Sequence, residues 1–156
     1  MDSVSSDTYF VLGVYIEFLL APSQASKQQA VLRCEMPAGT VVPLHSHQDV
    51  EIFYLLSGSM EVYQEGQGWK LVRSGEVIAV AGNVKHALRN SSSESVISVA
   101  ITDEQLYHFF LELGVQAGQS VPAPVEQMQK LMGAAARYEY WLGSPEDNAQ
   151  IGLSLG

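Results

Sequence analysis

Between residues 9 and 101, short apolar runs alternate with clusters of turn-forming residues. The breakers between the runs are rich in Gly, Pro, Ser and Asn. The predicted strands are Tyr9–Leu20, Ala30–Met36, Glu51–Leu56, Ser59–Gln64, Trp69–Val72, Val77–Val80, His86–Arg89 and Val96–Ile101. Many short strands with turn signals every 8–12 residues or so are typical of an antiparallel sandwich or barrel. We therefore expect an all-β fold over this part of the chain.

After residue 101 the apolar spacing changes from that of strands to that of helices. The apolar positions of a first predicted helix are Leu106, Phe109, Phe110 and Leu113. Thr102 or Asp103 is suited to cap its start, and Gly114 stands where a helix should end. Residues 116–124 are interpreted as a linker.

A second helix is predicted from Ala123 or Pro124 to Arg137. Its expected apolar face consists of Val125, Met128, Leu131, Met132 and Ala135. Residues 138–142 are expected to pack on the barrel, and the chain from Pro145 onward is expected to be frayed. The 156 residues suit one domain. Within it we expect a β-barrel at residues 1–114 and a helical extension at residues 115–156 that packs on the barrel.

The composition excludes several classes of partner. There are 17 Asp and Glu against 8 Lys and Arg, for a net charge of −9. An acidic surface repels phosphate backbones and anionic lipids, so neither nucleic acid nor a membrane is expected as a partner. Cys34 is the only cysteine, which excludes an internal disulfide and a Cys-rich metal site. A reducing, cytoplasmic location is the default expectation.

The apolar stretch from Tyr9 to Ala21 invites comparison with a secretory leader. Residues 1–8 contain Asp2 and Asp7 but no Lys or Arg, and Glu17 interrupts the apolar run. A leader begins with a positive segment, and a membrane span needs about 18 apolar residues. Neither a leader nor a membrane span is expected.

The candidate chemistry lies in residues 39–58. His45, His47 and Glu51 share one parity, so an extended strand would direct all three to the same side. Two imidazoles and a carboxylate are metal ligands by type. A His-x-His pair alone is often only a surface pair, but a buried Glu without a partner is costly, which favours a cation. Phe53 and Leu55 share this parity and would line a pocket beside the metal.

The same segment resembles the first motif of the cupin superfamily, in which Gly, His, His, Glu and Gly recur at fixed spacing. All five positions are matched, by Gly39, His45, His47, Glu51 and Gly58. The second cupin motif is matched at Gly75, His86 and Asn90. The resemblance covers residues from about 9 to 114. Residues 9–13 and 109–114 also resemble small single-domain cupins described as quercetin-dioxygenase-like.

Two positions depart from the second motif. Ala81 stands where the family has Pro, and Asn83 where it has Gly. Asn is the non-glycine residue best suited to a left-handed turn, so we expect the turn to survive. Loss of the Pro removes some rigidity and no ligand.

The resemblance implies a double-stranded β-helix, the jelly-roll barrel of cupins, with His45, His47, Glu51 and His86 as ligands of one divalent transition metal. The mixed nitrogen and oxygen set suits Mn, Fe, Co, Ni, Cu or Zn. Four ligands leave positions open for water, substrate or dioxygen. His108 and Cys34 are not expected to be ligands. The aromatic residues expected to serve packing or an interface are Tyr63, Trp69, Tyr107, Tyr138, Tyr140 and Trp141.

Three functions follow as hypotheses. The first is a metal-dependent oxygenase acting on a small aromatic or enolic substrate, with Glu51 as catalytic residue and Phe53, Leu55 and Leu88 in the substrate pocket. The second is a non-catalytic cupin that binds a small molecule. The third is a metal-dependent isomerase or decarboxylase. The fold hosts many chemistries, so resemblance alone does not choose among them. We expect a homodimer, since the first strand and the C-terminal helices offer apolar surface to bury.

Overall fold

The structure, a computed structural model, describes residues 7–155. The part of the leader argument that rests on Asp2, and the outermost ends of the two expected ranges 1–114 and 115–156, lie outside the described residues. Among the described helices, none is both long enough and apolar enough to cross a membrane.

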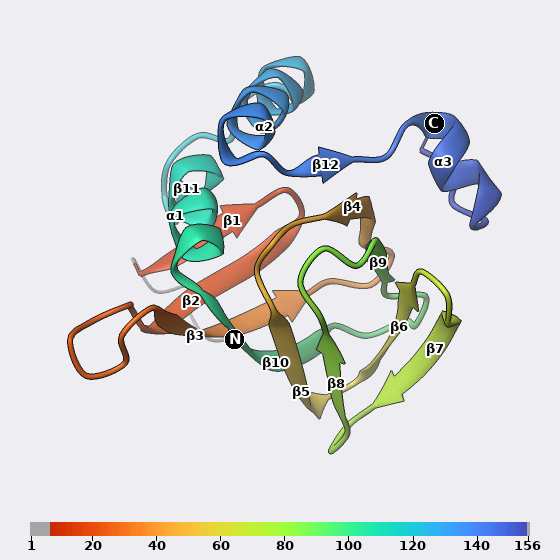
Figure 1. The fold of residues 1–156 in the computed structure, drawn as a ribbon, viewed down its shortest axis with the longest axis horizontal. Coiled ribbons are helices and arrows are strands. Elements are labelled where there is room, and N and C mark those ends of the chain that lie inside the picture. The colour runs from red at the N-terminus through yellow and green to blue at the C-terminus, as the bar shows by residue number, and fades with distance from the viewer. Residues whose placement is uncertain (1–6, 156) are drawn as a thin grey trace.

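Two antiparallel sheets face each other (Figure 1). In spatial order, the larger sheet consists of β11 (Val115–Gln116), β1 (Thr8–Val11), β2 (Val14–Leu20), β3 (Gln29–Met36), β10 (Val96–Asp103), β5 (Glu51–Ser57) and β8 (Val77–Val80). The smaller sheet consists of β12 (Trp141–Leu142), β4 (Val41–Ser46), β9 (His86–Arg89), β6 (Ser59–Gln64) and β7 (Gly68–Arg73).

The alternation of side chains along the strands builds the core between the sheets. In β10 every second residue is buried, and β6 shows the same period of two. Leu32 and Leu55 from the larger sheet and Val62 and Val72 from the smaller are almost fully buried in one apolar cluster. The expected all-β sandwich is confirmed.

The chain passes repeatedly from one sheet to the other. β4 lies in the smaller sheet and β5 in the larger, so residues 47–50 form a crossing between the two. The next crossing runs from β5 to β6 through Gly58, and a later one runs from β8 to β9 through residues 81–85. The first cupin motif thus spans two sheets, and its centre lies where they meet.

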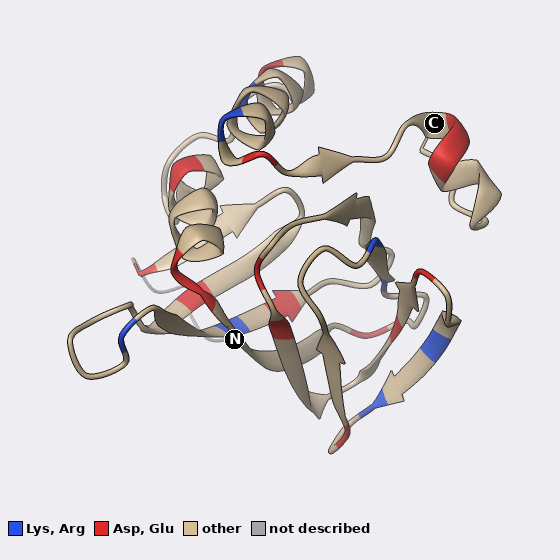
Figure 2. Cartoon of the chain, in the orientation of Figure 1, with Lys and Arg blue, Asp and Glu red and all other residues tan. Residues whose placement is uncertain are grey.

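The helices follow the last long strand. α1 (Glu104–Leu113) buries Leu106, Phe109 and Leu113, and Gly114 ends it as expected. α2 (Pro124–Tyr138) packs against α1, and α3 (Pro145–Gln150) lies near the C-terminus beside β4 (Figure 1). Figure 2 shows acidic residues spread over strands and helices and few basic ones, in keeping with the net charge of −9.

Three details of the predicted elements are wrong. The run Tyr9–Leu20 is a hairpin of β1 and β2, because Leu12 and Gly13 both adopt positive φ and reverse the chain. Residues 41–46 form β4, although Pro43 and His45 interrupt its apolar pattern. The segment from Pro145 is an ordered helix, because Ser144 and Asp147 cap each other's backbone N–H groups in a capping box.

The predicted apolar face of α2 is largely exposed. Val125, Met128 and Met132 are 68%, 54% and 59% exposed, and of the predicted face only Ala135 is fully buried. The helix packs instead through Ala134 and Ala135, with Leu131 partly buried, because these small side chains let it lie close to its neighbours. An apolar stripe on α2 therefore faces outward.

Gly58 at the β5–β6 crossing gives a test of the fold. It has φ +80°, and a Cβ there would lie 2.8 Å from the Ser95 carbonyl oxygen and 3.0 Å from Val96 Cα. Gly66 has φ +85° with nothing within 4 Å of a Cβ, so Gly66→Ala carries only the backbone strain. We expect Gly66→Ala to cost about 1 kcal/mol and Gly58→Ala about 2–4 kcal/mol of unfolding free energy, because the backbone around residue 95 must also move. Urea unfolding of both variants measures this; equal losses would contradict the close approach.

Candidate metal centre

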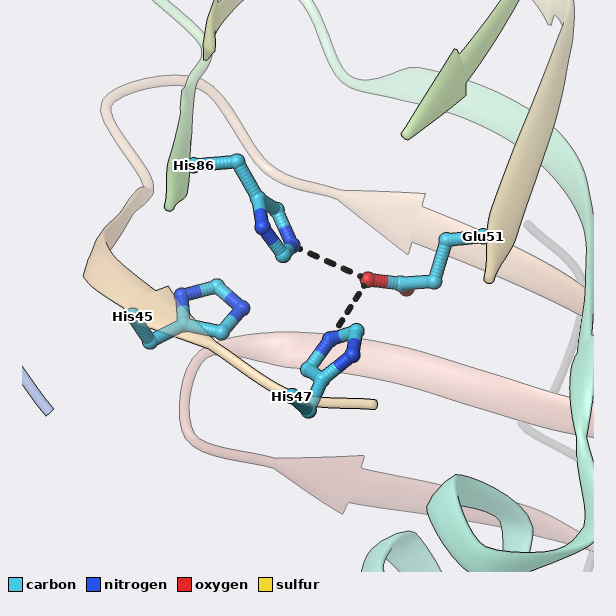
Figure 3. A group of neighbouring side chains, drawn as sticks. All are labelled: His45, His47, Glu51 and His86. Atoms are coloured by element: carbon cyan, nitrogen blue, oxygen red, sulfur yellow. Dashed lines mark hydrogen bonds and ion pairs between the residues drawn. The ribbon is translucent and has the colours of Figure 1, made fainter. Parts of the chain in front are cut away.

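Four side chains from both sheets converge between β4, β5 and β9 (Figure 3). His45 lies near the end of β4, His86 begins β9, and Glu51 begins β5. His47 belongs to the crossing between β4 and β5. His45 and His86 are direct partners across β4 and β9, with ring centroids 4.2 Å apart. One ligand-type atom from each of the four residues lies within 4.8 Å of the others.

The Glu51 carboxylate is the common neighbour of two imidazoles. Its Oε1 lies 3.0 Å from His47 Nε2 and 3.2 Å from His86 Nε2 (Figure 3). Two ligand atoms that each lie about 2.1 Å from one ion, at right angles, are about 3.0 Å apart. The two separations, which are hydrogen bonds in this structure, therefore also fit adjacent ligands around a single transition-metal ion.

Each imidazole also contacts a backbone carbonyl through its other nitrogen. His45 Nδ1 lies 2.7 Å from the Pro43 oxygen, His47 Nδ1 3.0 Å from the Asp49 oxygen and His86 Nδ1 2.8 Å from the Val84 oxygen. A carbonyl only accepts, so each Nδ1 donates its proton. Nε2 is then the nitrogen left to face the centre. Without an ion, Nε2 of His47 and of His86 hydrogen-bonds to Glu51. With an ion, the proton in that bond leaves and Nε2 supplies its lone pair, as in metal-ligating histidines. All three rings are thus prepared as Nε2 ligands.

Burial and the neighbouring groups shift the pKa values of the centre. Burial, helped by the nearby imidazoles of His86 and His47, lowers the pKa of His45 to about 3. Burial opposes ionisation of Glu51, but the hydrogen bonds from His47 and His86 outweigh it and hold its pKa well below the usual range. Burial also acts against protonation of His47, yet its contact with Glu51 raises the His47 pKa. The carboxylate is therefore ionised at neutral pH, which suits a cation.

The four ligands predicted from the sequence do lie together. The strand parity from which three of them were predicted is not the reason. His45, His47 and Glu51 do not share a face of one extended strand, because β4 ends at Ser46 and the chain crosses to the other sheet before Glu51. The two sheets supply His45 and Glu51 from opposite sides, and the crossing supplies His47. The spacing of the motif reflects this crossing and not strand parity.

Several long-range hydrogen bonds hold the crossing, residues 47–50, in place. The side chains of the two residues expected to cap α1 bind this crossing and do not cap the helix. Thr102 Oγ1 donates to the Val50 oxygen at 2.8 Å, and Val50 N donates to Asp103 Oδ2 at 3.2 Å. In return, Leu106 N in the first turn of α1 donates to Asp49 Oδ1 at 3.1 Å. The helix start and the ligand segment therefore cap each other.

The β8–β9 crossing supports the centre from the other side. Asn83 has φ +66°, so the left-handed turn expected of it is confirmed, and its N–H donates to the His47 oxygen at 2.7 Å. A Cβ on Gly82 would lie 2.4 Å from the Gln48 oxygen. The two motif segments thus lie backbone to backbone, which only glycine at position 82 permits.

The three residues expected to line a substrate pocket belong to the apolar core. Phe53 and Leu55 are buried on β5 on the same side as Glu51, and Leu88 is partly buried on β9 against the same apolar cluster. Their contact with a substrate stays a prediction. Burial, with the Glu51 charge, raises the pKa of the Cys34 thiol to about 12, so it is not a thiolate ligand at neutral pH.

The other residues singled out from the sequence have mainly structural roles. His108 is half exposed on α1 beside Glu104. Lys85 lies 4.4 Å from the Trp141 ring centroid, and Arg89 lies 4.0 Å from that of Trp69 while pairing with Glu61. These two cations therefore both have partners within the protein.

Sequence reasoning missed Asp49 and underestimated Tyr140. The Tyr140 hydroxyl donates to Asp49 Oδ2 at 2.7 Å, and its ring centroid lies 5.4 Å from that of His47. Asp49 occupies a variable position of the motif, and 91 residues separate it from Tyr140. The only indication in the sequence was that an acidic residue, Asp49, lies between the predicted ligands His47 and Glu51.

Comparisons with known proteins agree with this architecture. Residues 32–102 match the Cupin_2 family, described as cupin domain. No curated protein matches the sequence. The cupin domain of Cnp3 from Schizosaccharomyces pombe superposes with a TM-score of 0.52 at 21% identity, covering 58% of this chain and 64% of that one.

Two further similar structures are described by an enzymatic activity, which for one of them is a predicted activity. A structure of the DMSP lyases RdDddP and RnDddQII has a TM-score of 0.51 at 15% identity and covers 58% of this chain and 47% of its own. A predicted oxalate decarboxylase from Thermotoga maritima has a TM-score of 0.56 at 22% identity and covers 66% and 98%. The chain spans less than two thirds of the Cnp3 domain and of the lyase, and identities this low show the fold alone.

The family match, the two-sheet fold with its crossings and the four converging side chains agree. The chain is therefore a Cupin_2 domain protein: residues 32–102 match that family, and a cupin domain is among its structural neighbours.

Proposed function

We propose that the protein is a metal-dependent enzyme, an oxygenase acting on a small aromatic or enolic substrate. One divalent transition metal (Mn, Fe, Co, Ni, Cu or Zn) would be held by His45, His47, Glu51 and His86. The observation that carries the proposal is the convergence of three Nε2 atoms, each prepared by an Nδ1 hydrogen bond, on one ionised carboxylate. Such a preorganised centre with more coordination positions than protein ligands is the arrangement of catalytic sites.

A bound ion of this class supplies Lewis acidity and, for the redox-active metals, one-electron chemistry. The protein's own residues would do the rest. The three backbone carbonyls keep the imidazoles oriented, and Phe53, Leu55 and Leu88 provide an apolar wall that limits water. Glu51, ionised because of its lowered pKa, would hold the metal through one carboxylate oxygen and could take up a substrate proton on the other.

A second candidate is a metal-dependent lyase or decarboxylase acting on a small carboxylate. It is favoured by the similar structures, one described as a predicted oxalate decarboxylase and one as DMSP lyases. The likeness supports this only as a shared scaffold, because folds of this kind host many reactions. Requirement for dioxygen separates the two candidates.

Metal content tests the centre itself. Protein purified without a histidine tag should contain about one equivalent of transition metal by elemental analysis after loading. The variant with His45, His47, Glu51 and His86 all replaced by Ala should contain none, because it lacks every ligand. His108→Ala is the matched control and should keep the full equivalent, since His108 lies half exposed on α1. Equal metal in wild type and quadruple variant would contradict the site.

Oxygen uptake tests the reaction class. With each reconstituted metal and a panel of small phenols and enols, turnover should consume dioxygen and stop under anaerobic conditions. Glu51→Ala together with His47→Ala should reduce the rate by at least about 10²-fold, since both hold the metal and Glu51 is the proposed proton acceptor. Turnover of a small carboxylate without oxygen would contradict the oxygenase proposal and support the lyase or decarboxylase. Tight binding of a small molecule with no product over hours would contradict both and support a non-catalytic binding protein.

We also propose that the protein is a homodimer that buries the outward stripe of α2. Val125, Met128 and Met132 stand at helical spacing on one face and are more than half exposed. Contiguous apolar surface of this kind marks interaction sites.

Light scattering at micromolar concentration should give twice the chain mass of 17.0 kDa for the wild type. Met128→Asp should give a monomer, because it places a charge in the proposed interface. Val77→Asp, at a position 56% exposed on the edge strand β8, is the matched control and should remain dimeric. A monomeric wild type would refute the proposal.

A further inference from the structure

Asp49 lies between two of the metal ligands and is not one of them. The residue is 3% exposed, and both of its carboxylate oxygens have specific partners. Oδ1 accepts from Leu106 N at 3.1 Å, and Oδ2 accepts from the Tyr140 hydroxyl at 2.7 Å. A carboxylate buried this fully needs such donors, so its position is tied to α1 and to the C-terminal extension.

The backbone of the same residue orients a ligand. The Asp49 carbonyl oxygen accepts the Nδ1 proton of His47 at 3.0 Å. Because the side chain is anchored at both oxygens, the Cα of Asp49 is restrained, and with it the carbonyl group that this Cα carries. The path from Tyr140 to His47 Nε2 therefore runs through one residue, over hydrogen bonds of 2.7 and 3.0 Å.

Tyr140, like Asp49, is buried and has specific packing partners. It is 9% exposed, and its ring packs between His47 and Phe109, at centroid distances of 5.4 and 4.8 Å. The following residues form β12, in which Trp141 pairs with Ser46 and Leu142 with His45. Burial and the Asp49 carboxylate raise the pKa of Tyr140, so its hydroxyl stays protonated and donates.

We propose that Asp49 and Tyr140 form a positioning pair through which the C-terminal extension sets the metal affinity of the centre. The proposal rests on the metal-binding function proposed above and assigns a role to two residues that touch no metal. Outer partners that orient a ligating histidine are worth 10–100-fold in metal affinity. The pair orients His47 indirectly, because it restrains the Asp49 carbonyl that accepts the His47 Nδ1 proton.

The test compares two conservative variants with a matched control. Tyr140→Phe removes the hydroxyl and keeps the ring that packs on His47. Asp49→Asn keeps the shape but replaces one acceptor oxygen with a donor. Tyr138→Phe is the control, because its ring lies 5.6 Å from that of Tyr140 in the same cluster. Co²⁺ affinity is measured by competition with a chromophoric chelator, alongside the visible spectrum of bound Co²⁺ and the melting temperature of the metal-free protein.

Tyr140→Phe and Asp49→Asn should each weaken Co²⁺ binding about 10–100-fold and alter its visible spectrum, while Tyr138→Phe stays within twofold of wild type. Wild-type affinity and spectrum in both variants would overturn the inference while leaving the metal site intact. A lower melting temperature with unchanged affinity would likewise reduce the pair to a structural role and overturn it.

A second measurement does not depend on metal. Proton–nitrogen NMR correlations of the metal-free protein should show the His47 Nδ1–H protected from exchange with water in wild type and Tyr138→Phe, because it donates to the Asp49 carbonyl. In Tyr140→Phe the same proton should exchange at least several-fold faster. An unchanged exchange rate in Tyr140→Phe would overturn the positioning role. If the wild type binds no metal but the Nδ1–H loses protection in the variant, the proposed function fails and the positioning of His47 stands.

Discussion

A carboxylate placed inside a protein must be surrounded by donors or by a cation, and Glu51 imposes this requirement on the junction of the two sheets. It is 8% exposed and begins a strand whose next inward residues, Phe53 and Leu55, are apolar core. His47 and His86 meet the requirement from the crossing and from the facing sheet. The arrangement of β4, β5 and β9 can be understood as the means of bringing three imidazoles to one charge.

The backbone around this charge is held by hydrogen bonds between the crossing, residues 47–50, and the start of α1. A helix start leaves N–H groups without partners, and its own cap residue usually satisfies one of them. In this chain Asp103 stands at the N-cap position and makes no capping hydrogen bond with its side chain; it accepts from Val50 instead, and Asp49 accepts from Leu106. One pair of hydrogen bonds therefore stabilises the helix and also fixes the segment that carries His47.

How far the sequence predicts the structure depends on the range of the interaction. The period of two in β10 and the fixed intervals of His45, His47, Glu51 and His86 are visible locally, so the sandwich and the ligand set could be predicted. The hairpin at Leu12 needed a non-glycine residue at positive φ, which no apolar pattern reveals. Asp49 and Tyr140 could not be linked, because nothing local relates residues 91 positions apart. The face of α2 was misjudged because small Ala side chains pack closely while larger apolar ones remain outside.

The contacts that shape the centre also bear on the order in which the protein assembles. The hydrogen bonds from residues 49 and 50 to the start of α1 join residues 53 and 57 positions apart in the sequence. The bond between Asp49 and Tyr140 spans 91 positions, and the bond from Leu44 N to Asn148 spans 104. Closing loops of this length is slow relative to local structure, because chain entropy is lost before any contact compensates it. During synthesis, the barrel strands leave the ribosome before residues 139–153 that fasten β4. The contacts from Tyr140 and Asn148 can form only after those residues have been synthesised, so the surroundings of the centre are completed late in folding although its ligands lie between residues 45 and 86.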